Sequence, residues 1–413
     1  MWTHLLERSL KGLIRRGRLR LDLPGGRQVT LGDGDTAFPD VAVTIHDHGT
    51  ARRLLLNPEL ALGEAYTDAR LTIAGDDLHG LLELALRNLR SGVRSPTIRL
   101  NRHLRNWLRG LRQFNPAARA QRNVAHHYDL SGAFYALFLD ADRQYSCAYF
   151  RTPDDTLEAA QAQKKAHVAR KLCLEPGMRV LDIGCGWGGM ALTLAREHGA
   201  EVLGITLSRE QLAHARARAE AAGLDNRVRF EMRDYRQLRG QFDRIVSVGM
   251  FEHVGTPHYR DYFRTIRDRL HPDGVALVHT IGRADPPGST NPWIARYIFP
   301  GGYVPAMSEV LDAVEREGLW TTDVEVLRLH YAMTLRHWHD RFRTNEAQIR
   351  EMFDARFCRM WRYYLVACEQ TFRFNTQCVF QVQLAREQDA VPLTRDYLHA
   401  PDPADAALTR AAE

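Results

Sequence analysis

A glycine-rich turn between an apolar run and a helical pattern constrains the fold of this chain more than any other feature. Residues 180–189 read VLDIGCGWGG, so a strand-like run containing Asp182 leads into Gly184, Gly186 and Gly189. Glycines at such a turn let the backbone approach a ligand that any side chain would exclude. A turn that binds nothing is a poor alternative, because five glycine and aspartate positions coincide with one strand-to-helix junction. We therefore expect a nucleotide-binding loop.

The segments around this turn alternate between strands and helices. Helical patterns cover 189–198 and 208–222. The alternation predicts an α/β fold with a mostly parallel, doubly wound sheet. The expected strands are 179–183, 201–205, 228–232, 243–248 and 274–280.

The residues after the second predicted strand separate two classes of ligand. A dinucleotide site places an acidic residue there to bind the ribose hydroxyls. Here the strand ends in GITLS at 204–208, which has no carboxylate. Asp182 instead ends the first strand, where class I methyltransferases carry an acid facing the methionyl part of their cofactor. We interpret the domain as a class I Rossmann-like, S-adenosylmethionine-dependent methyltransferase rather than a nicotinamide enzyme.

The length of 413 residues predicts two domains. Residues 1–95 combine a hairpin around Gly25-Gly26 with a leucine-rich helical pattern at 79–89, which together predict a small α+β N-terminal domain. We expect this domain to associate with lipid, on account of the basic residues described below. We expect an Arg-rich linker at 96–122, the methyltransferase domain at 123–388, and a disordered tail at 389–413.

Basic residues are concentrated in two segments, although the net charge is only +6. Residues 2–14 place apolar positions at helical spacing among basic ones, which predicts a basic amphipathic helix. Residues 87–127 contain ten arginines and no acidic residue. Both segments indicate an anionic partner. We favour a membrane surface over nucleic acid, because no recognisable nucleic-acid-binding module accompanies the charge.

Two further features bear on the compartment. No apolar run approaches the roughly 20 residues of a spanning helix, and the N-terminus lacks the apolar stretch of a signal peptide. We expect a cytoplasmic enzyme that associates peripherally with the inner face of the membrane.

The cysteines form no C-x-x-C pair and are interpreted as buried free thiols, and no ligand spacing predicts a metal. The cysteines are Cys147, Cys173, Cys185, Cys358, Cys368 and Cys378.

Several further motifs indicate a family. They are NVAHHYD at 123–129, YSCAYF at 145–150, GITLS at 204–208 with Gln211, GMFEHVG at 249–255, HTI at 279–281, YIFPGG at 297–302, HYA at 330–332 and RMW at 359–361. In this order the chain resembles the cyclopropane-fatty-acyl-phospholipid synthase family, which includes the mycolic acid cyclopropane synthases.

The resemblance implies a reaction in which the alkene of an acyl chain attacks the sulfonium methyl group, and a base then removes a proton so that a ring closes. In the family, bound bicarbonate is that base. The implied bicarbonate ligands are Cys147 and Ile281, through their backbone amides, and Glu252, His279 and Tyr331. The implied cofactor contacts are Tyr145, Ser146, Asp182, Gly184, Gly186, Thr206, Leu207, Gln211, Asp234, Tyr235 and Arg236.

The chemistry is consistent with the residue types. A carbocation needs a dry pocket and is stabilised by aromatic faces. The candidates for that pocket are Tyr297, Phe299, Tyr303, Tyr331, Trp338, Trp361, Tyr363 and Tyr364. Taken singly, these aromatic residues, His279 and Cys147 would be interpreted as core residues, and it is their joint occurrence that favours a site.

We expect cyclopropanation of unsaturated phospholipid acyl chains, and the resemblance also suggests a homodimer. The nearest alternative stops before ring closure and gives a methyl-branched chain. A second alternative is a methyltransferase for a small soluble substrate, which would not need the basic segments. A third is a non-catalytic, membrane-bound S-adenosylmethionine binder, against which the intact set of Glu252, His279 and Tyr331 argues.

Overall fold

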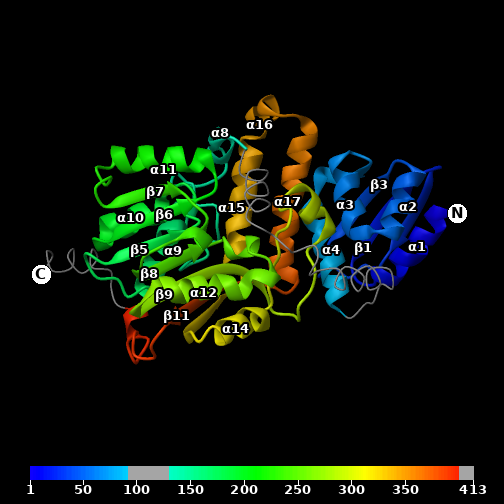
Figure 1. The fold of residues 1–413 in the computed structure, drawn as a ribbon. Coiled ribbons are helices and arrows are strands. Elements are labelled where there is room, and N and C mark those ends of the chain that lie inside the picture. The colour runs from blue at the N-terminus through cyan, green and yellow to red at the C-terminus, as the bar shows by residue number, and fades with distance from the viewer. Residues whose placement is uncertain (92–129, 400–413) are drawn as a thin grey trace, which may run out of the picture. The chain divides into compact units, whose positions relative to one another are not determined.

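The structure, a computed structural model, describes residues 1–91 and 130–399, which divide into two compact units (Figure 1). Unit 1 takes its described residues from Met1–Gln113, Arg283–Val304 and Tyr331–Cys378. Unit 2 takes its described residues from Phe114–Gly282, Pro305–His330 and Val379–Glu413. The contiguous domains predicted at 1–95 and 123–388 do not coincide with these units, because two later segments pack with the N-terminal residues.

The described part of unit 1 contains a four-stranded sheet in the order β2-β1-β3-β4. β1 alternates buried leucines with outward-facing residues, and the glycine turn at 25–26 returns the chain antiparallel as β2, as the sequence predicted. The strands are β1 (Arg18–Leu23), β2 (Arg27–Leu31), β3 (Asp40–Ile45) and β4 (Leu71–Ile73).

Helices from distant parts of the chain complete unit 1. The long helix α17 packs against α3 and α4, and α13 also packs against α3. The helices are α1 (Trp2–Leu13), α2 (His48–Leu56), α3 (Pro58–Thr67), η1 (Ala74–Asp76), α4 (Leu78–Arg90), α13 (Pro292–Tyr297), α15 (His330–Thr344), α16 (Glu346–Met352) and α17 (Ala355–Phe374).

The predicted basic amphipathic helix forms as α1, but part of its apolar side belongs to the core of unit 1. Leu6 is buried, and α1 packs against α2, whereas Leu5 is exposed. The apolar face of this helix therefore serves folding in part, which reduces the surface that it could offer to lipid.

Unit 2 is built on a seven-stranded sheet, counted over the described residues, in the order β10-β11-β9-β8-β5-β6-β7. The pairs β5–β6, β6–β7, β5–β8 and β8–β9 are parallel, whereas β10 and β11 are antiparallel. The strands are β5 (Arg179–Ile183), β6 (Glu201–Thr206), β7 (Val228–Met232), β8 (Phe242–Val248), β9 (Leu270–Arg283), β10 (Trp320–Leu327) and β11 (Gln377–Ala385).

Helices cover both faces of this sheet. The chain moves from β5 to β7 in one direction and from β8 to β9 in the other, so right-handed crossovers place α10 and α11 on one face and α12 on the opposite face. The helices are α8 (Gly132–Ala136), α9 (Leu157–Lys171), α10 (Gly189–His198), α11 (Arg209–Ala221), η2 (Tyr235–Gln237), η3 (Phe251–His253), η4 (Thr256–His258), α12 (Tyr259–Arg269), α14 (Met307–Arg316) and η5 (Asp396–Leu398).

The predicted α/β class and all five predicted strands are confirmed, whereas β10 and β11 were not predicted. The stretch predicted as a disordered tail from residue 389 differs in its first part, because the Tyr397 hydroxyl bonds with Gln383 and Arg395 pairs with Asp323. The predicted linker at 96–122, the motif at 123–129 and residues 400–413 lie outside the described residues. Within the described ranges, no helix is long and apolar enough to cross a membrane.

Candidate active site

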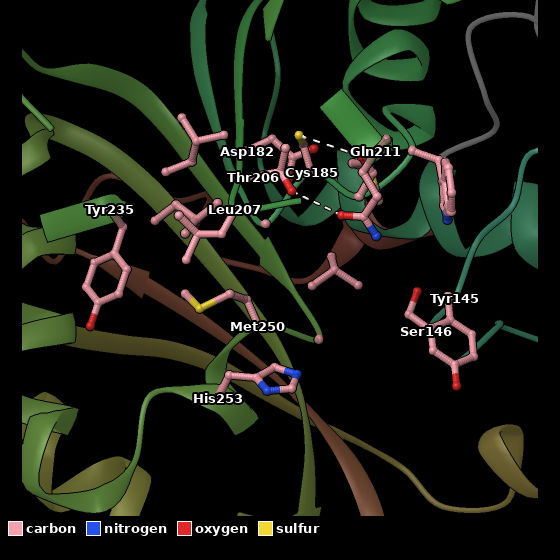
Figure 2. A pocket seen from close by; sticks show the side chains of 18 of the residues that line it. Tyr145, Ser146, Asp182, Cys185, Thr206, Leu207, Gln211, Tyr235, Met250 and His253 are labelled. Carbon is pink, nitrogen blue, oxygen red and sulfur yellow. Dashed lines mark hydrogen bonds between the residues drawn. The ribbon is translucent and has the colours of Figure 1, made fainter. Parts of the chain in front are cut away.

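A cavity opens at the carboxyl ends of the parallel strands of unit 2 (Figure 2). Every cofactor contact implied by the sequence resemblance lines it. In Figure 2, Tyr235 lies at one end of the cavity and Tyr145 and Ser146 lie at the other, with Asp182 and Thr206 between them. This edge of an open α/β sheet is where ligands bind in such folds.

The glycine-rich turn shapes the floor of the cavity. Gly184 and Gly186 both have positive φ angles, of 83° and 54°, which favour glycine over other residues. A Cβ atom at Gly186 would meet no atom within 4 Å, so the backbone there faces open space. The turn therefore leaves main-chain groups facing the cavity at the place where the sequence predicted a nucleotide-binding loop.

Asp182 brings an incompletely satisfied carboxyl group to this floor. Its side chain is buried at the end of β5, and its Oδ2 atom has no hydrogen-bond partner among the described residues. Burial raises its pKa to about 7, while the charge of Lys164 opposes that rise. An orphaned buried carboxyl oxygen is costly unless a donor or cation reaches it. The cationic methionyl end of S-adenosylmethionine is such a group, so the residues fit this cofactor.

Thr206 and Gln211 form the middle of the cavity wall. Thr206 ends β6, and its hydroxyl donates to Gln211 Oε1 at 3.0 Å. Ser208 accepts from the Gln211 backbone amide and so caps α11. Since the Gln211 oxygen is engaged by Thr206, its amide NH₂ group can donate to a ligand hydroxyl. This pair occupies the place that a ribose-binding carboxylate takes in dinucleotide sites.

An ion pair defines the end of the cavity near Tyr235. Asp234 accepts from the backbone amide and the guanidinium of Arg236 at 2.6–3.0 Å. Burial opposes ionisation of Asp234, but the hydrogen bonds and charge of Arg236 lower its pKa overall. The Tyr235 ring packs edge-on against Tyr262, with centroids 5.3 Å apart. A flat aromatic wall beside an ionised carboxylate suits a purine ring with an exocyclic amine.

A second group of predicted residues lies just beyond β8 and within β9. The carboxylate of Glu252 accepts from the Ile281 backbone amide at 2.6 Å, and its other oxygen is buried without a well-placed donor in the described chain. Burial raises the pKa of Glu252 to about 7, opposed mainly by the Ile281 amide. His279 lies two residues before Ile281 on the same side of the strand. Burial, with smaller contributions from nearby cations, lowers the pKa of His279 to about 3.

The histidine is therefore neutral at ordinary pH. Its Nδ1 atom lies 3.1 Å from the side-chain amide of Gln381, which fixes the orientation of the ring. A neutral histidine and a carboxyl group that titrates near neutrality can each contact a small oxyanion or hold a proton.

The two remaining predicted bicarbonate ligands fall in different units. Cys147 belongs to unit 2 and is buried, and its thiol donates to the Ala148 carbonyl. Tyr331 belongs to unit 1, where its ring packs against Trp338 and Phe372. The structure thus directly joins Glu252 to Ile281, while the common site of all five residues stays a prediction. The aromatic residues predicted for an acyl pocket also all belong to unit 1.

Several cavity residues were not predicted. They include Gln144, Trp187, Met250 and His253. Met250 and His253 flank Glu252 in the GMFEHVG motif, which was the available signal, but only the carboxylate drew attention there. Burial lowers the pKa of His253 to about 4, so it presents a neutral ring to the cavity.

Comparisons with known proteins identify the family of the chain. The family model described as mycolic acid cyclopropane synthetase matches residues 116–382. The chain belongs to this family. A second model, described as a domain of unknown function, matches residues 6–97. As a member of the mycolic acid cyclopropane synthetase family, the chain is an S-adenosylmethionine-dependent methyltransferase, which confirms the class predicted from the glycine loop.

Individual relatives cover most of the chain. It is 39% identical over 339 residues to the cyclopropane-fatty-acyl-phospholipid synthase of Escherichia coli strain K12, spanning 81% of this chain and 85% of that protein. It is 36% identical to a protein of Pseudomonas putida named probable fatty acid methyltransferase, over 86% and 88% of the two chains. Among solved structures, the mycolic acid cyclopropane synthase CmaA1 complexed with SAH and CTAB superposes with a TM-score of 0.61 at 34% identity, covering 66% of this chain and 99% of that one.

Proposed function

We propose that this chain is a cyclopropane-fatty-acyl-phospholipid synthase, which adds a methylene group from S-adenosylmethionine across the double bond of an unsaturated phospholipid acyl chain. The observation that carries the proposal is the buried Glu252 carboxyl group, which accepts from the Ile281 amide and lies in the chain between the cavity-lining residues Met250 and His253. Ring closure after methyl transfer to an alkene requires the loss of a proton from carbon, so a base must lie near the developing cation. The name of the Escherichia coli relative supports the same activity.

Each part of the cavity has a role in this proposal. Asp182 faces the cationic methionyl end together with Tyr145 and Ser146, and Thr206 with Gln211 binds the ribose. Asp234, Tyr235 and Arg236 enclose the adenine. When bound, S-adenosylmethionine supplies the electrophilic methyl group. The protein orients that group and excludes water from the reacting alkene, because water would quench a carbocation to an alcohol.

We infer that the base is bicarbonate, held by the amides of Cys147 and Ile281 and by Glu252, His279 and Tyr331. The Ile281 amide donates to a Glu252 oxygen, so bound bicarbonate would share this donor with Glu252 or replace Glu252 as its acceptor. The unpartnered oxygen of Glu252 can accept the hydroxyl proton of bicarbonate, and the neutral ring of His279 can contact the anion. Bound there, bicarbonate would supply the group that accepts the proton lost on ring closure.

The substrate requires contact with a membrane. We propose that the basic segments at the N-terminus and at 87–127 dock the enzyme on the inner, anionic face of the bilayer, and that the enzyme works as a homodimer. Each basic residue near an anionic surface contributes about 1 kcal/mol. Four such contacts would give roughly millimolar affinity before any apolar insertion, which is reversible docking rather than anchoring.

The test is mass spectrometry of lipids after the purified protein is incubated with unsaturated phospholipid vesicles, bicarbonate and S-adenosylmethionine. A gain of one CH₂ with loss of the olefin signal establishes cyclopropanation. The same gain with the olefin retained would assign the chain to methylation without ring closure, a second candidate that the Pseudomonas putida relative favours by its name and its coverage. No gain on any lipid, with cofactor still bound, would refute both.

A further inference from the structure

A fully buried lysine lies behind one wall of the cofactor cavity. Lys164, on α9, has 0% of its surface exposed. Its Nζ atom donates to Gln144 Oε1 at 2.6 Å and to Ser146 Oγ at 2.9 Å. Both acceptors line the cavity. The ammonium group therefore supports the cavity wall from within the protein.

The supported segment has no regular secondary structure to hold it. Residues 144–146 lie between the described elements α8 and α9 and form neither helix nor strand. Gln161, one turn before Lys164, donates its Nε2 to the backbone carbonyls of Gln144 and Ser146, at 3.3 and 3.0 Å. Gln161 thus fixes the backbone of this segment, and Lys164 fixes two of its side chains.

The buried charge also acts on the opposite part of the cavity floor. An ammonium in the protein interior is costly unless acids and acceptors surround it. Burial lowers the pKa of Lys164 to about 8, partly offset by the charges of Asp140 and Asp142. In turn, its positive charge counteracts the burial that raises the pKa of Asp182. Because the protein interior has a low dielectric constant, the charge of Lys164 is weakly screened and acts on the carboxyl group of Asp182.

We propose that Lys164 is a positioning residue of the cofactor cavity, which orients Ser146 and Gln144 toward the place of the cationic end of S-adenosylmethionine and adds its charge to the electrostatic field at Asp182. The inference rests on the proposed placement of the cofactor and is independent of the lipid substrate. Lys164 acts through the three cavity residues.

The same helix supplies a matched control. Lys171 is also 0% exposed, seven residues further along α9. Its Nζ lies 2.6 Å from Glu325 and 3.3 Å from Asp323, and neither acid lines the cavity. Substituting either lysine removes a buried ammonium from one helix, so general effects on stability appear in both variants, whereas effects on the cavity appear only for Lys164.

The experiment is titration calorimetry of S-adenosylmethionine into the full-length protein and its variants Lys164→Met and Lys171→Met. Loss of hydrogen bonds from a charged donor predicts that Lys164→Met binds the cofactor about 10- to 100-fold more weakly. Lys171→Met should bind within roughly twofold of the wild type. Equal affinity of Lys164→Met and the wild type would overturn the proposal.

A pH series separates positioning from mere structural support. In the wild type, cofactor affinity should rise as Asp182 ionises near pH 7. Without the ammonium, the pKa of Asp182 is higher, so this rise should move to higher pH in Lys164→Met. The ionisation of the ligand itself is common to both proteins and cancels in their difference. An affinity loss of the same size at every pH would mean that Lys164 only supports the fold.

Two further variants keep the test decisive if Lys164→Met fails to fold. Lys164→Gln retains a donor for Ser146 but no charge, so it should shift the pH dependence with a smaller loss of affinity. Lys164→Arg retains the charge, so it should keep the wild-type pH dependence. The proposal would be refuted if Lys164→Gln kept the wild-type pH dependence and Lys164→Arg shifted it. A wild-type protein that binds no S-adenosylmethionine would instead contradict the proposed function itself.

Discussion

Replacing Glu252 with glutamine should separate stability from activity. The folded-state pKa of Glu252, about 7, lies above the ordinary value of 4.5 because of burial. The folded state therefore favours the protonated form, and ionisation destabilises it increasingly from about pH 4.5 up to pH 7. The rise in the pKa of Glu252 from 4.5 to about 7 corresponds to a loss of folding stability of roughly 3 kcal/mol, and this loss is complete above pH 7. Glutamine cannot ionise, and its amide oxygen can still accept from Ile281.

The measurement is the unfolding free energy of the wild type and Glu252→Gln at pH 4.5 and pH 8, in buffers free of bicarbonate. The advantage of the variant should be about 3 kcal/mol larger at pH 8 than at pH 4.5. For 413 residues unfolding together, this is roughly 3 °C in Tm. Asp182 titrates in both proteins and cancels from the comparison.

Turnover should fall severely in the same variant, with cofactor affinity retained, because an amide cannot replace a carboxyl group in holding or moving a proton. If the unfolding free energies of the wild type and Glu252→Gln differed equally at both pH values, burial would not raise the pKa of Glu252. Unchanged turnover would remove it from the chemistry.

Three other outcomes follow from the structure. Gly282→Ala should destabilise the protein by about 1–3 kcal/mol in urea unfolding, because its Cβ would lie 2.0 Å from the Phe380 ring, and adding Phe380→Leu should recover part of the loss. Glu369→Gln should cost about 1–3 kcal/mol by the same measurement, because this buried carboxylate accepts from Arg336, Arg373 and His79, whose side chains are 21–40% exposed; a loss below about 0.5 kcal/mol would contradict its role. Anionic liposomes should sediment the protein and salt should release it, whereas indifference to lipid charge would rule out electrostatic docking.

The sequence was most informative where backbone conformation and chemistry coincide. The glycine turn, the strand that precedes it and the missing carboxylate at the end of β6 predicted the class of cofactor and its binding loop, whereas the other lining residues were implied by the family resemblance. Parallel strands buried on both faces are largely apolar runs, which explains why β5, β6, β8 and the centre of β9 could be predicted. The edge strand β7 was predicted from its alternation of buried and more exposed residues. β10 and β11 are interrupted by polar residues, such as the buried Gln381 and Gln383, so the pattern did not predict strands there.

Features that depend on long-range packing could not be predicted. Lys164 has the sequence context of a lysine on an exposed helix face, KKAHVARK, and its burial follows only from the packing of α9 behind the cavity. The assignment of residues 331–378 to unit 1 depends on the contacts of α17 with α3 and α4, which lie more than 250 residues earlier. Local spacing contains no information on partners at that distance.

The discontinuity of unit 1 has a consequence for synthesis on the ribosome. The apolar faces of α3 and α4 are translated early, but their partner α17 emerges about 265 residues after α4 ends. At about 5–20 residues per second, that interval lasts roughly 15–50 s. During this time the nascent N-terminal segment exposes surface that the finished protein buries, while the central strands of unit 2 can already assemble. The N-terminal residues are therefore expected to need protection from aggregation, and a fragment that stops before Ala355 should depend on chaperones or precipitate.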